Sequence, residues 1–309
     1  MIDIVGKRRW YFLASGILIL IGIISMIVSQ AQLGSPLRLG TDFTGGTTMM
    51  LHFNPSVAQS DLRDEMARQG HDGALIQYAG EGDFIVHTTQ ITSDEARDLA
   101  ALLGEELDSE VSVIDYRSTS PAVAARTARD AFIAVIIAAV AMMLYIVWAF
   151  RRMPSPLRWG ACAVIALLHD VFIIIGIFSL LGWFAGVTVD AMFITGILAV
   201  VGYSINNTVV IFDRIRENVS KQLRVDFETT VNDSLVETLS RCLNTALTTL
   251  FVLLALFLFG GTTIQYFVLV LLLGVIIGTY SSLGISSQLL VVWEKRDWRS
   301  LLPFARRPA

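Results

Sequence analysis

The chain has 309 residues, of which 54% are hydrophobic and only 16% are charged, and its formal net charge is -4. Soluble globular domains carry roughly a quarter of charged residues, so this composition excludes an ordinary soluble domain and favours a membrane protein. Both cysteines, Cys162 and Cys242, lie in apolar segments, so we expect small core residues and no disulfide framework.

Six apolar segments approach or exceed the roughly 20 residues that a helix needs to cross a bilayer. They cover about residues 10–29, 130–150, 160–181, 191–212, 239–259 and 265–292. The first segment could instead be a cleaved signal peptide, whose apolar core is roughly 7 to 15 residues long. Its apolar core runs about nineteen residues, which favours an uncleaved anchor. The sequence therefore predicts a polytopic α-helical membrane protein with six transmembrane helices.

Basic residues mark one side of the predicted spans. They precede the first span, join the second to the third, follow the fourth and form the tail, and they are Lys7, Arg8, Arg9, Arg151, Arg152, Arg158, Arg214, Arg216, Lys221, Arg224, Lys295, Arg296, Arg299, Arg306 and Arg307. The opposite connections, 182–190 and 260–264, contain none. By the positive-inside rule both termini are cytoplasmic and the segment between the first two spans is external. The predicted parts are residues 1–29 (N-terminus and first span), 30–125 (external domain), 126–293 (remaining spans) and 294–309 (cytoplasmic tail).

The external segment is acidic, with five arginines against fifteen aspartates and glutamates. Its strand-like segments are 47–53, 74–79, 83–88 and 109–117, and its helix-like segments are 56–70 and 93–107. Thr92 and Glu95 form a candidate capping box at the start of the second helix. The order β-α-β-β-α-β predicts a ferredoxin-like α+β domain.

His169 and Asp170 lie about ten residues into the third predicted span, which at about 1.5 Å per residue places them at mid-membrane depth. Ionisable residues there cost several kcal/mol, so they usually face a bundle interior or an ion path. One interpretation is a structural pair that only hydrogen-bonds neighbouring helices. We favour a pair that binds protons or holds a gate, because imidazole titrates near neutrality.

The fourth span carries polar residues within GYSINNTVVIFDRIREN, Gly202 to Asn218. Helical spacing places Tyr203, Asn206 and Asn207 on one side, with Ser204 and Thr208 as an adjoining ridge. Amides do not titrate, so this face can orient a proton or a water molecule but cannot carry charge. Asp213 can titrate, but it belongs to the charged helix end, where Arg214 and Arg216 are expected to be solvated.

The fifth span begins with SRCLNTALTT, in which Arg241, Asn244, Thr245, Thr248 and Thr249 fall on one helical face. Arginine is always charged, so a carboxylate partner is expected nearby. Alternatively, Arg241 snorkels to water, because it lies only about one turn from the predicted cytoplasmic edge. The neighbouring amide and hydroxyls favour a buried network.

The remaining features point to packing rather than to chemistry. Gly274 and Gly278 form a GxxxG pair, for which close helix packing is a sufficient explanation. Within a cytoplasmic region near 213–238, residues 226–238 are expected to form a short amphipathic surface helix.

His52, His71 and His87 lack metal-ligand spacing, so we expect no metal site. Without a phosphate loop, nucleophile elbow or kinase signature, we expect neither an enzyme nor a cofactor, a catalytic residue or a nucleic-acid partner.

Five motifs follow one another along nearly the whole chain. They are GTDFTGGT (Gly40 to Thr47, with Asp42, Gly45 and Gly46), LLHDV (Leu167 to Val171), VGYSINNTVVIFDRIREN (Val201 to Asn218), LSRCLNTALTTL (Leu239 to Leu250) and GTYSS (Gly278 to Ser282). In these motifs the chain resembles the SecF family, the smaller partners in SecDF protein-export complexes, which are similar to resistance-nodulation-division transporters. The resemblance implies a SecD partner, a twelve-span assembly and association with the SecYEG channel. It also implies that the proton-motive force helps unfolded secreted chains to leave the bacterial cytoplasmic (inner) membrane.

The resemblance further implies a proton pathway, with one departure. The family usually reads Asn-Asp-Thr or Asn-Asp-Ser in the fourth span, and that aspartate acts with the arginine of the fifth span. The arginine corresponds to Arg241, whereas the aspartate position holds Asn207, and Cys242 stands where the family usually has threonine. Asn207 is a mimic of the protonated carboxylate, a variant whose coupling uses carboxylates elsewhere such as Asp170, or a sign of lost coupling. The first explanation predicts that the protein rests in the conformation that a protonated aspartate would favour.

Two other functions stay open at this point. The chain could be half of a proton-driven small-molecule or lipid exporter, although the predicted external domain is small for that class. It could also be a structural assembly factor whose intramembrane polar residues only hold helices together.

Overall fold

The computed structural model describes residues 2–221 and 226–298. Its contacts separate two compact units. The helical unit takes in the described residues of Met1–Ser25, Ala134–Ile177 and Met192–Ala309. The α+β unit takes in Met26–Ile133 and Phe178–Ala191.

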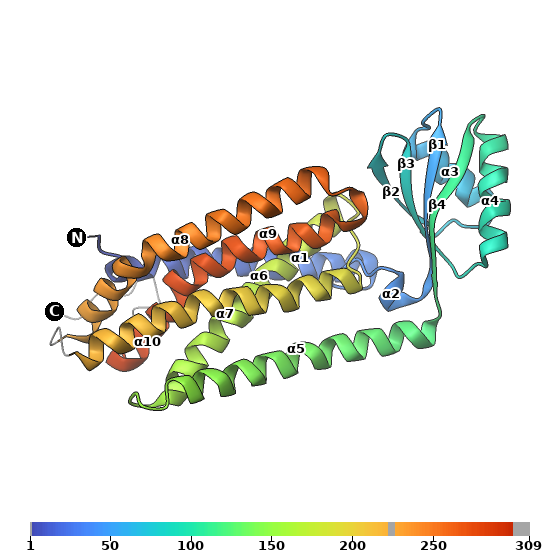
Figure 1. Ribbon diagram of the computed structural model, residues 1–309. Coiled ribbons are helices and arrows are strands. Elements are labelled where there is room, and N and C mark those ends of the chain that lie inside the picture. The colour runs from blue at the N-terminus through green and yellow to red at the C-terminus, as the bar shows by residue number, and fades with distance from the viewer. Residues whose placement is uncertain (1, 222–225, 299–309) are drawn as a thin grey trace. The chain divides into compact units, whose positions relative to one another are not determined.

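Six helices are long and apolar enough to cross a membrane, which confirms the predicted spans (Figure 1). They are α1 (Arg8–Leu33, after a 3-10 turn at Val5–Lys7), α5 (Pro121–Ala149), α6 (Pro156–Phe184), α7 (Ala191–Ser220), α8 (Phe227–Phe259) and α9 (Thr262–Ser281), which continues through a π-helical turn, η2 (Ser282–Ser286), into α10 (Ser287–Lys295). Most extend beyond the apolar segments, because polar end turns continue the backbone hydrogen bonding of the helix.

The expected surface helix at 226–238 is not a separate element. Those residues form the first turns of α8, and the Asp226 side chain caps the helix by accepting a hydrogen bond from the Thr229 N–H at 3.0 Å. No breaker residue occurs between this segment and the apolar part of α8, so the helix continues without interruption.

Small residues allow the helices of the helical unit to approach closely. A Cβ atom at Gly22 of α1 would lie 2.9 Å from the Gly176 Cα of α6. A Cβ atom at Gly274 of α9 would lie 1.9 Å from Val200 Cγ2 of α7. Both cysteines are buried core residues, as expected. By contrast, only 6% of the apolar window of α5 and 11% of that of α8 is buried, against 56% for α6. Two spanning helices therefore leave most of their surface uncovered in the chain by itself.

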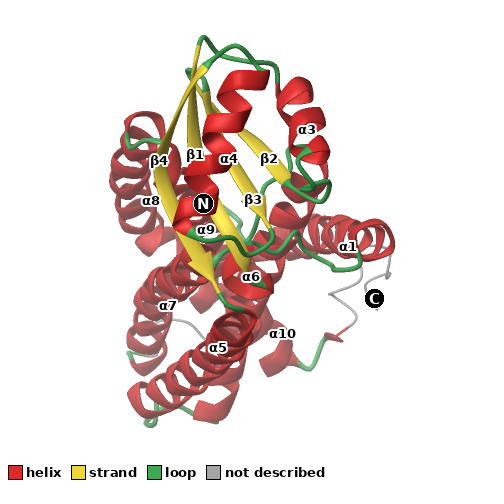
Figure 2. Cartoon of the chain, turned by 90° about the vertical axis from the view of Figure 1, so that its right-hand side faces the viewer, coloured by secondary structure: helices red, strands yellow, loops and turns green. Residues whose placement is uncertain are grey.

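The α+β unit contains the predicted ferredoxin-like order. A single turn, α2 (Thr41–Thr44), precedes β1 (Gly46–Asn54), α3 (Gln59–Arg68), β2 (Leu75–Gly80), β3 (Asp83–Thr88), α4 (Ser93–Glu106) and β4 (Glu110–Thr119). The strands form an antiparallel sheet in the order β2-β3-β1-β4, and α3 and α4 cover one face (Figure 2).

The core between that sheet and its helices is built from alternate strand residues, including Leu51, Phe53 and Phe84, packed against α3 and α4. The capping box of Thr92 and Glu95 is present as predicted. Helix α3, however, begins at Gln59 rather than near residue 56, and its N-cap residue makes no side-chain hydrogen bond.

Candidate functional site

Asp170 on α6 is the centre of a buried polar site in the helical unit. The residue is 1% exposed. Its Oδ2 accepts hydrogen bonds from Ser204 Oγ of α7 at 2.6 Å and from Ser281 Oγ of α9 at 2.8 Å. Its Oδ1 lies 2.9 Å from His169 Nδ1. Three helices therefore converge on one carboxyl group that has no access to solvent.

A chain of hydrogen bonds continues from the other side of the His169 ring. His169 Nε2 lies 2.8 Å from Ser15 Oγ of α1, and Ser15 Oγ lies 3.0 Å from the Tyr280 hydroxyl of α9. That hydroxyl donates to the backbone carbonyl of Tyr11 at 2.7 Å. The buried carboxyl group is thus linked to the second turn of α1 through an imidazole and two hydroxyls.

The backbone of α9 explains how its side chains reach this site. A Cβ atom at Gly278 would lie 3.0 Å from Ser204 Cβ, so glycine allows α9 to approach α7 at this level. The π-helical turn η2 begins directly after Ser281, and Ser287 Oγ donates to the Ser282 carbonyl five residues earlier. Single π-helical turns inside α-helices are frequent at functional sites.

Asn207 lies beside this site, but Asn206 does not. Asn207 is 3% exposed and its Nδ2 donates to Thr279 Oγ1 of α9 at 3.2 Å. Thr208 shares a hydrogen bond of 2.9 Å with Ser282 Oγ, so the ridge predicted with Ser204 packs inward. Asn206 is exposed. The expectation of one face holding both amides is therefore wrong, because Asn206 lies about 100° around the helix from Asn207 and outside the buried face that holds Ser204, Asn207 and Thr208.

The polar face predicted for the start of the fifth span is not a buried network within this chain. Arg241, Asn244 and Thr248 of α8 are exposed, and among the described residues no carboxylate lies within ion-pair distance of Arg241. The hydroxyls of Thr245 and Thr248 donate to backbone carbonyls of their own helix, at 2.9 and 3.0 Å. A neutral hydroxyl needs no partner from another helix when such a carbonyl is within reach.

The charged end of α7 is solvated, as expected. Arg216 pairs with Asp213 at 2.5 Å, and Arg214 bridges Glu217 at 2.7 Å and Glu237 of α8 at 2.5 Å. These side chains are at least a third exposed. Asp213 thus belongs to a surface ion-pair cluster rather than to the buried site.

The motif that contains Asp42, Gly45 and Gly46 shapes the α+β unit. Asp42 Oδ2 accepts a hydrogen bond from the Ala191 backbone N–H at 3.0 Å. Gly45 has φ of 78° and Gly46 has φ of 121°, and a Cβ atom at Gly46 would lie 2.4 Å from the Thr88 carbonyl oxygen. Only glycine fits this backbone path into β1.

A histidine of the sheet lies near the same motif. His87 Nδ1 of β3 lies 2.8 Å from Thr48 Oγ1 of β1, which in turn lies 2.6 Å from Thr41 Oγ1. Burial lowers the pKa of His87 to about 4, although the Asp42 carboxylate acts in the opposite direction and Arg38 in the same direction. The imidazole of His87 is therefore neutral at physiological pH.

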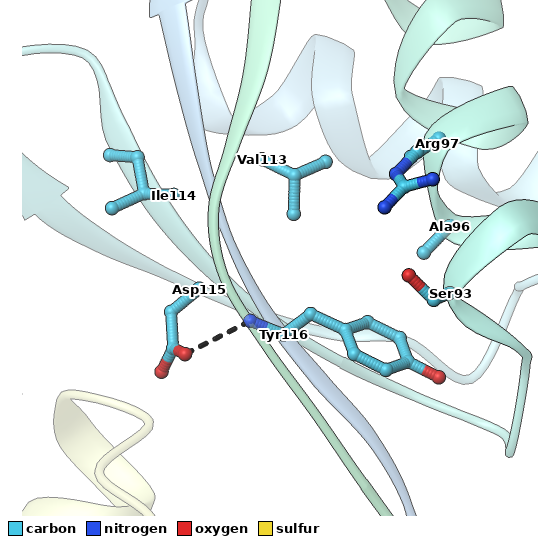
Figure 3. A pocket seen from close by; sticks show the side chains of 7 residues that line it. All are labelled: Ser93, Ala96, Arg97, Val113, Ile114, Asp115 and Tyr116. Atoms are coloured by element: carbon cyan, nitrogen blue, oxygen red, sulfur yellow. Dashed lines mark hydrogen bonds between the residues drawn. The ribbon is translucent and has the colours of Figure 1, made fainter.

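A shallow groove between α4 and β4 offers no catalytic arrangement (Figure 3). Asp115 accepts a hydrogen bond from the Tyr116 backbone N–H at 3.0 Å and pairs with Arg117 at 3.1 Å. Asp115 thus satisfies a backbone donor of the edge strand β4, and this arrangement disfavours the addition of a further strand.

Sequence reasoning found Asp170 and His169 but missed Ser15 and Tyr280. Ser15 is one of three serines in the first apolar span, and Tyr280 lies within the motif GTYSS. The signal that could have found Tyr280 is the position of a phenol between the small residues of a packed helix. Nothing in the sequence singles out Ser15.

Comparisons with known proteins give a consistent result. Residues 100–296 match the family described as Protein export membrane protein SecD/SecF, C-terminal. The Protein translocase subunit SecF of Thermobaculum terrenum is 39% identical over 310 residues, covering 96% of this chain and 96% of that protein. The subunit of the same name from Anaerolinea thermophila is 36% identical over 312 residues, covering 100% of this chain and 99% of that protein.

Solved structures show a similar likeness over part of a longer chain. The crystal structure of SecDF, a translocon-associated membrane protein from a Thermus species, matches with a TM-score of 0.83 and 31% identity. SecDF in a form described as Super-membrane-facing matches with a TM-score of 0.67 and 31% identity. Each match covers 96% of this chain, and this chain spans only 39% of each SecDF chain.

Proposed function

The chain belongs to the SecD/SecF family of protein-export membrane proteins, and on this premise we propose that it is an auxiliary subunit of the bacterial Sec translocase. It acts with a SecD-like partner and the SecYEG channel on unfolded polypeptides, and it couples the proton-motive force to late steps of export. It works as a transport subunit rather than as an enzyme. Both termini lie in the cytoplasm and the α+β domain lies outside the cytoplasmic membrane.

The observation that carries the proposed coupling is the buried carboxyl group of Asp170. Inserting an ionisable side chain at the centre of a membrane helix costs about 2.5 to 3.5 kcal/mol even on the insertion scale. An apolar side chain would pack there without this cost, so packing alone does not explain the residue. Here hydroxyls from two other helices and an adjacent imidazole surround the group. Such a carboxyl group can bind and release a proton at the point where α6, α7 and α9 meet.

The exposed polar side chains support a SecD-like partner. In a bilayer, Arg241, Asn244 and Asn206 need cover by protein, because lipid tails satisfy neither a guanidinium nor an amide. The exposed surfaces of α5 and α8 offer a large area for such cover. The partner supplies the counter-charge for Arg241, which this chain lacks among its described residues.

Asn207 fits the second explanation for its departure from the family pattern, in which another carboxylate carries the proton. The Asn207 amide cannot exchange a proton, whereas the buried carboxyl group of Asp170 can, and the hydrogen bond from Asn207 to Thr279 links α7 to α9 whatever the proton state of Asp170. If the position also sets the resting conformation, the Asn207→Asp variant will show a different, pH-dependent distribution of distances between the α+β domain and the membrane part. Identical distributions at all pH values would contradict that hypothesis.

The test of the function is gradient-driven completion of export in vesicles that contain this protein, its SecD-like partner and the channel. We expect the native form and Asn207→Asp both to respond to the proton gradient. A response from Asn207→Asp alone would show that position 207 is the coupling group and that the native form is uncoupled. If neither form responds while the complex stays intact, the translocation function itself is wrong. Gradient-driven efflux of a small molecule or lipid would favour the exporter instead.

A further inference from the structure

The donor and the acceptor in each hydrogen bond of the chain beside Asp170 follow from its last member, the Tyr11 carbonyl. A carbonyl oxygen only accepts, so the Tyr280 hydroxyl donates its single proton to it. The Tyr280 oxygen must then accept at its other contact, with Ser15 Oγ at 3.0 Å. Ser15 is therefore the donor in that hydrogen bond.

Counting the hydroxyl protons in the same way gives the protonation of the histidine. Ser15 has one proton, which it gives to Tyr280, so its oxygen accepts at the 2.8 Å contact with His169 Nε2. His169 consequently carries a proton on Nε2. Its other ring nitrogen, Nδ1, faces Asp170 Oδ1 at 2.9 Å. That distance is a hydrogen bond only if one proton lies between the two atoms, because two lone pairs repel each other.

The opposite oxygen of the carboxyl group has no room for this proton. Asp170 Oδ2 already accepts from Ser204 and from Ser281, at 2.6 and 2.8 Å. The proton therefore belongs to the Oδ1 side. Whether it sits on the carboxyl group or on the imidazole, the pair of His169 and Asp170 is neutral as a whole.

We propose that Ser15 and Tyr280 are positioning residues that hold His169 in the Nε2–H form, so that Asp170 Oδ1 and His169 Nδ1 make a site for a single proton. This inference deepens the proposed proton coupling by stating which atoms hold the proton and how many protons they hold. A neutral pair also fits its surroundings. The titratable group that faces it from another helix is the phenol of Tyr280, whose ring centroid lies 6.2 Å from that of His169, and no charged side chain of another element forms an ion pair with it in the described chain.

Release of that proton has a structural consequence. It leaves two lone pairs facing each other across 2.9 Å, so the His169 ring must turn away from Asp170. Turning the ring also breaks the hydrogen bond between His169 Nε2 and Ser15, which is a direct link between α6 and α1. Proton release therefore loosens α1 from α6, and proton binding restores the link.

The test uses the full chain with its SecD-like partner in lipid, with ¹⁵N-labelled histidine, and assigns the His169 signals from a His169→Gln sample. Native protein is expected to show His169 protonated on Nε2. Tyr280→Phe removes the acceptor for Ser15, whose hydroxyl can then donate to His169 Nε2. The proton that Nε2 held leaves the pair for the solvent, so a population of His169 protonated only on Nδ1 is expected, and its share should rise with pH. Tyr11→Phe is the matched control, because it removes a hydroxyl from the same aromatic pair and keeps the accepting carbonyl. Its spectrum is expected to equal that of the native protein.

Ser15→Ala is the second variant, and it keeps the test decisive if Tyr280→Phe fails to fold. It removes the acceptor of the His169 Nε2–H group. His169 is therefore expected to show a mixture of forms rather than the Nε2–H form alone. A native His169 without a proton on Nε2 would overturn the proposal, and so would the native spectrum in both Tyr280→Phe and Ser15→Ala. The readout is spectroscopic, so it separates this inference from export. A variant with a changed His169 spectrum and intact gradient-driven export would support the proton site and count against its proposed use.

Discussion

Acidification should destabilise the α+β domain through His87. The pKa of this imidazole is about 4 in the folded domain, against 6.5 as its ordinary value, because burial disfavours the charged form. The unfolded chain therefore binds more protons between those two pH values, and stability is lost as the pH falls through this window. At about 1.36 kcal/mol per pH unit, the domain loses about 2 kcal/mol between pH 7 and pH 5 from this group alone.

The assay is amide hydrogen exchange of β1 and β3 in the full chain, corrected for the intrinsic pH dependence of exchange. His87→Gln keeps a side chain that can hydrogen-bond Thr48 but cannot titrate, so its loss of protection between pH 7 and pH 5 should be smaller by about 2 kcal/mol. His52→Gln is the control, because His52 pairs with Asp83 at 2.7 Å and its side chain is 39% exposed. Equal pH dependence in native protein and His87→Gln would refute the reasoning.

Three further outcomes follow from packing and exposure. Gly278→Val should lower the stability of the helical unit by about 1 to 3 kcal/mol in thermal unfolding, since the valine side chain would push α9 away from α7. Gly202→Ala is the control, and it should change that stability little, because no atom lies near the added methyl group. Gly46→Ala should destabilise β1 by at least about 1 kcal/mol in hydrogen exchange, because its φ of 121° and the nearby Thr88 carbonyl both oppose a side chain. Arg241→Gln should leave the melting temperature of the isolated chain unchanged and weaken its copurification with the SecD-like partner. An unchanged yield of the complex would argue against Arg241 as an interface residue.

Local pattern was sufficient for most of the helices and strands of this protein, although it placed a separate surface helix at 226–238 where α8 runs without interruption. Six long apolar segments became six long helices, and alternation with turn signals located the strands of the sheet. The capping box at Thr92 was readable because its two hydrogen bonds lie within four residues of sequence. These features depend only on neighbours along the chain, so no tertiary information is needed to find them.

The site itself depended on tertiary contacts that the sequence does not encode locally. Asp170 and His169 stood out because ionisable residues are rare in apolar spans. Their partners lie far away in sequence, with Ser15 and Tyr280 separated by 265 residues, so the sequence could not assign them. The exposure of Asn206 and Arg241 in this chain could not be predicted for the same reason, because helical periodicity groups residues into faces but does not say which face another helix covers.

The most direct test of the account compares gradient-driven export by the native protein and by Asp170→Asn, in vesicles that contain the SecD-like partner and the channel. Asparagine keeps the shape of the carboxyl group and can accept from Ser204 and Ser281, but it cannot exchange a proton. The account predicts an intact complex whose export no longer responds to the proton gradient. A gradient response equal to that of the native protein would contradict the claim that Asp170 is the proton-binding group.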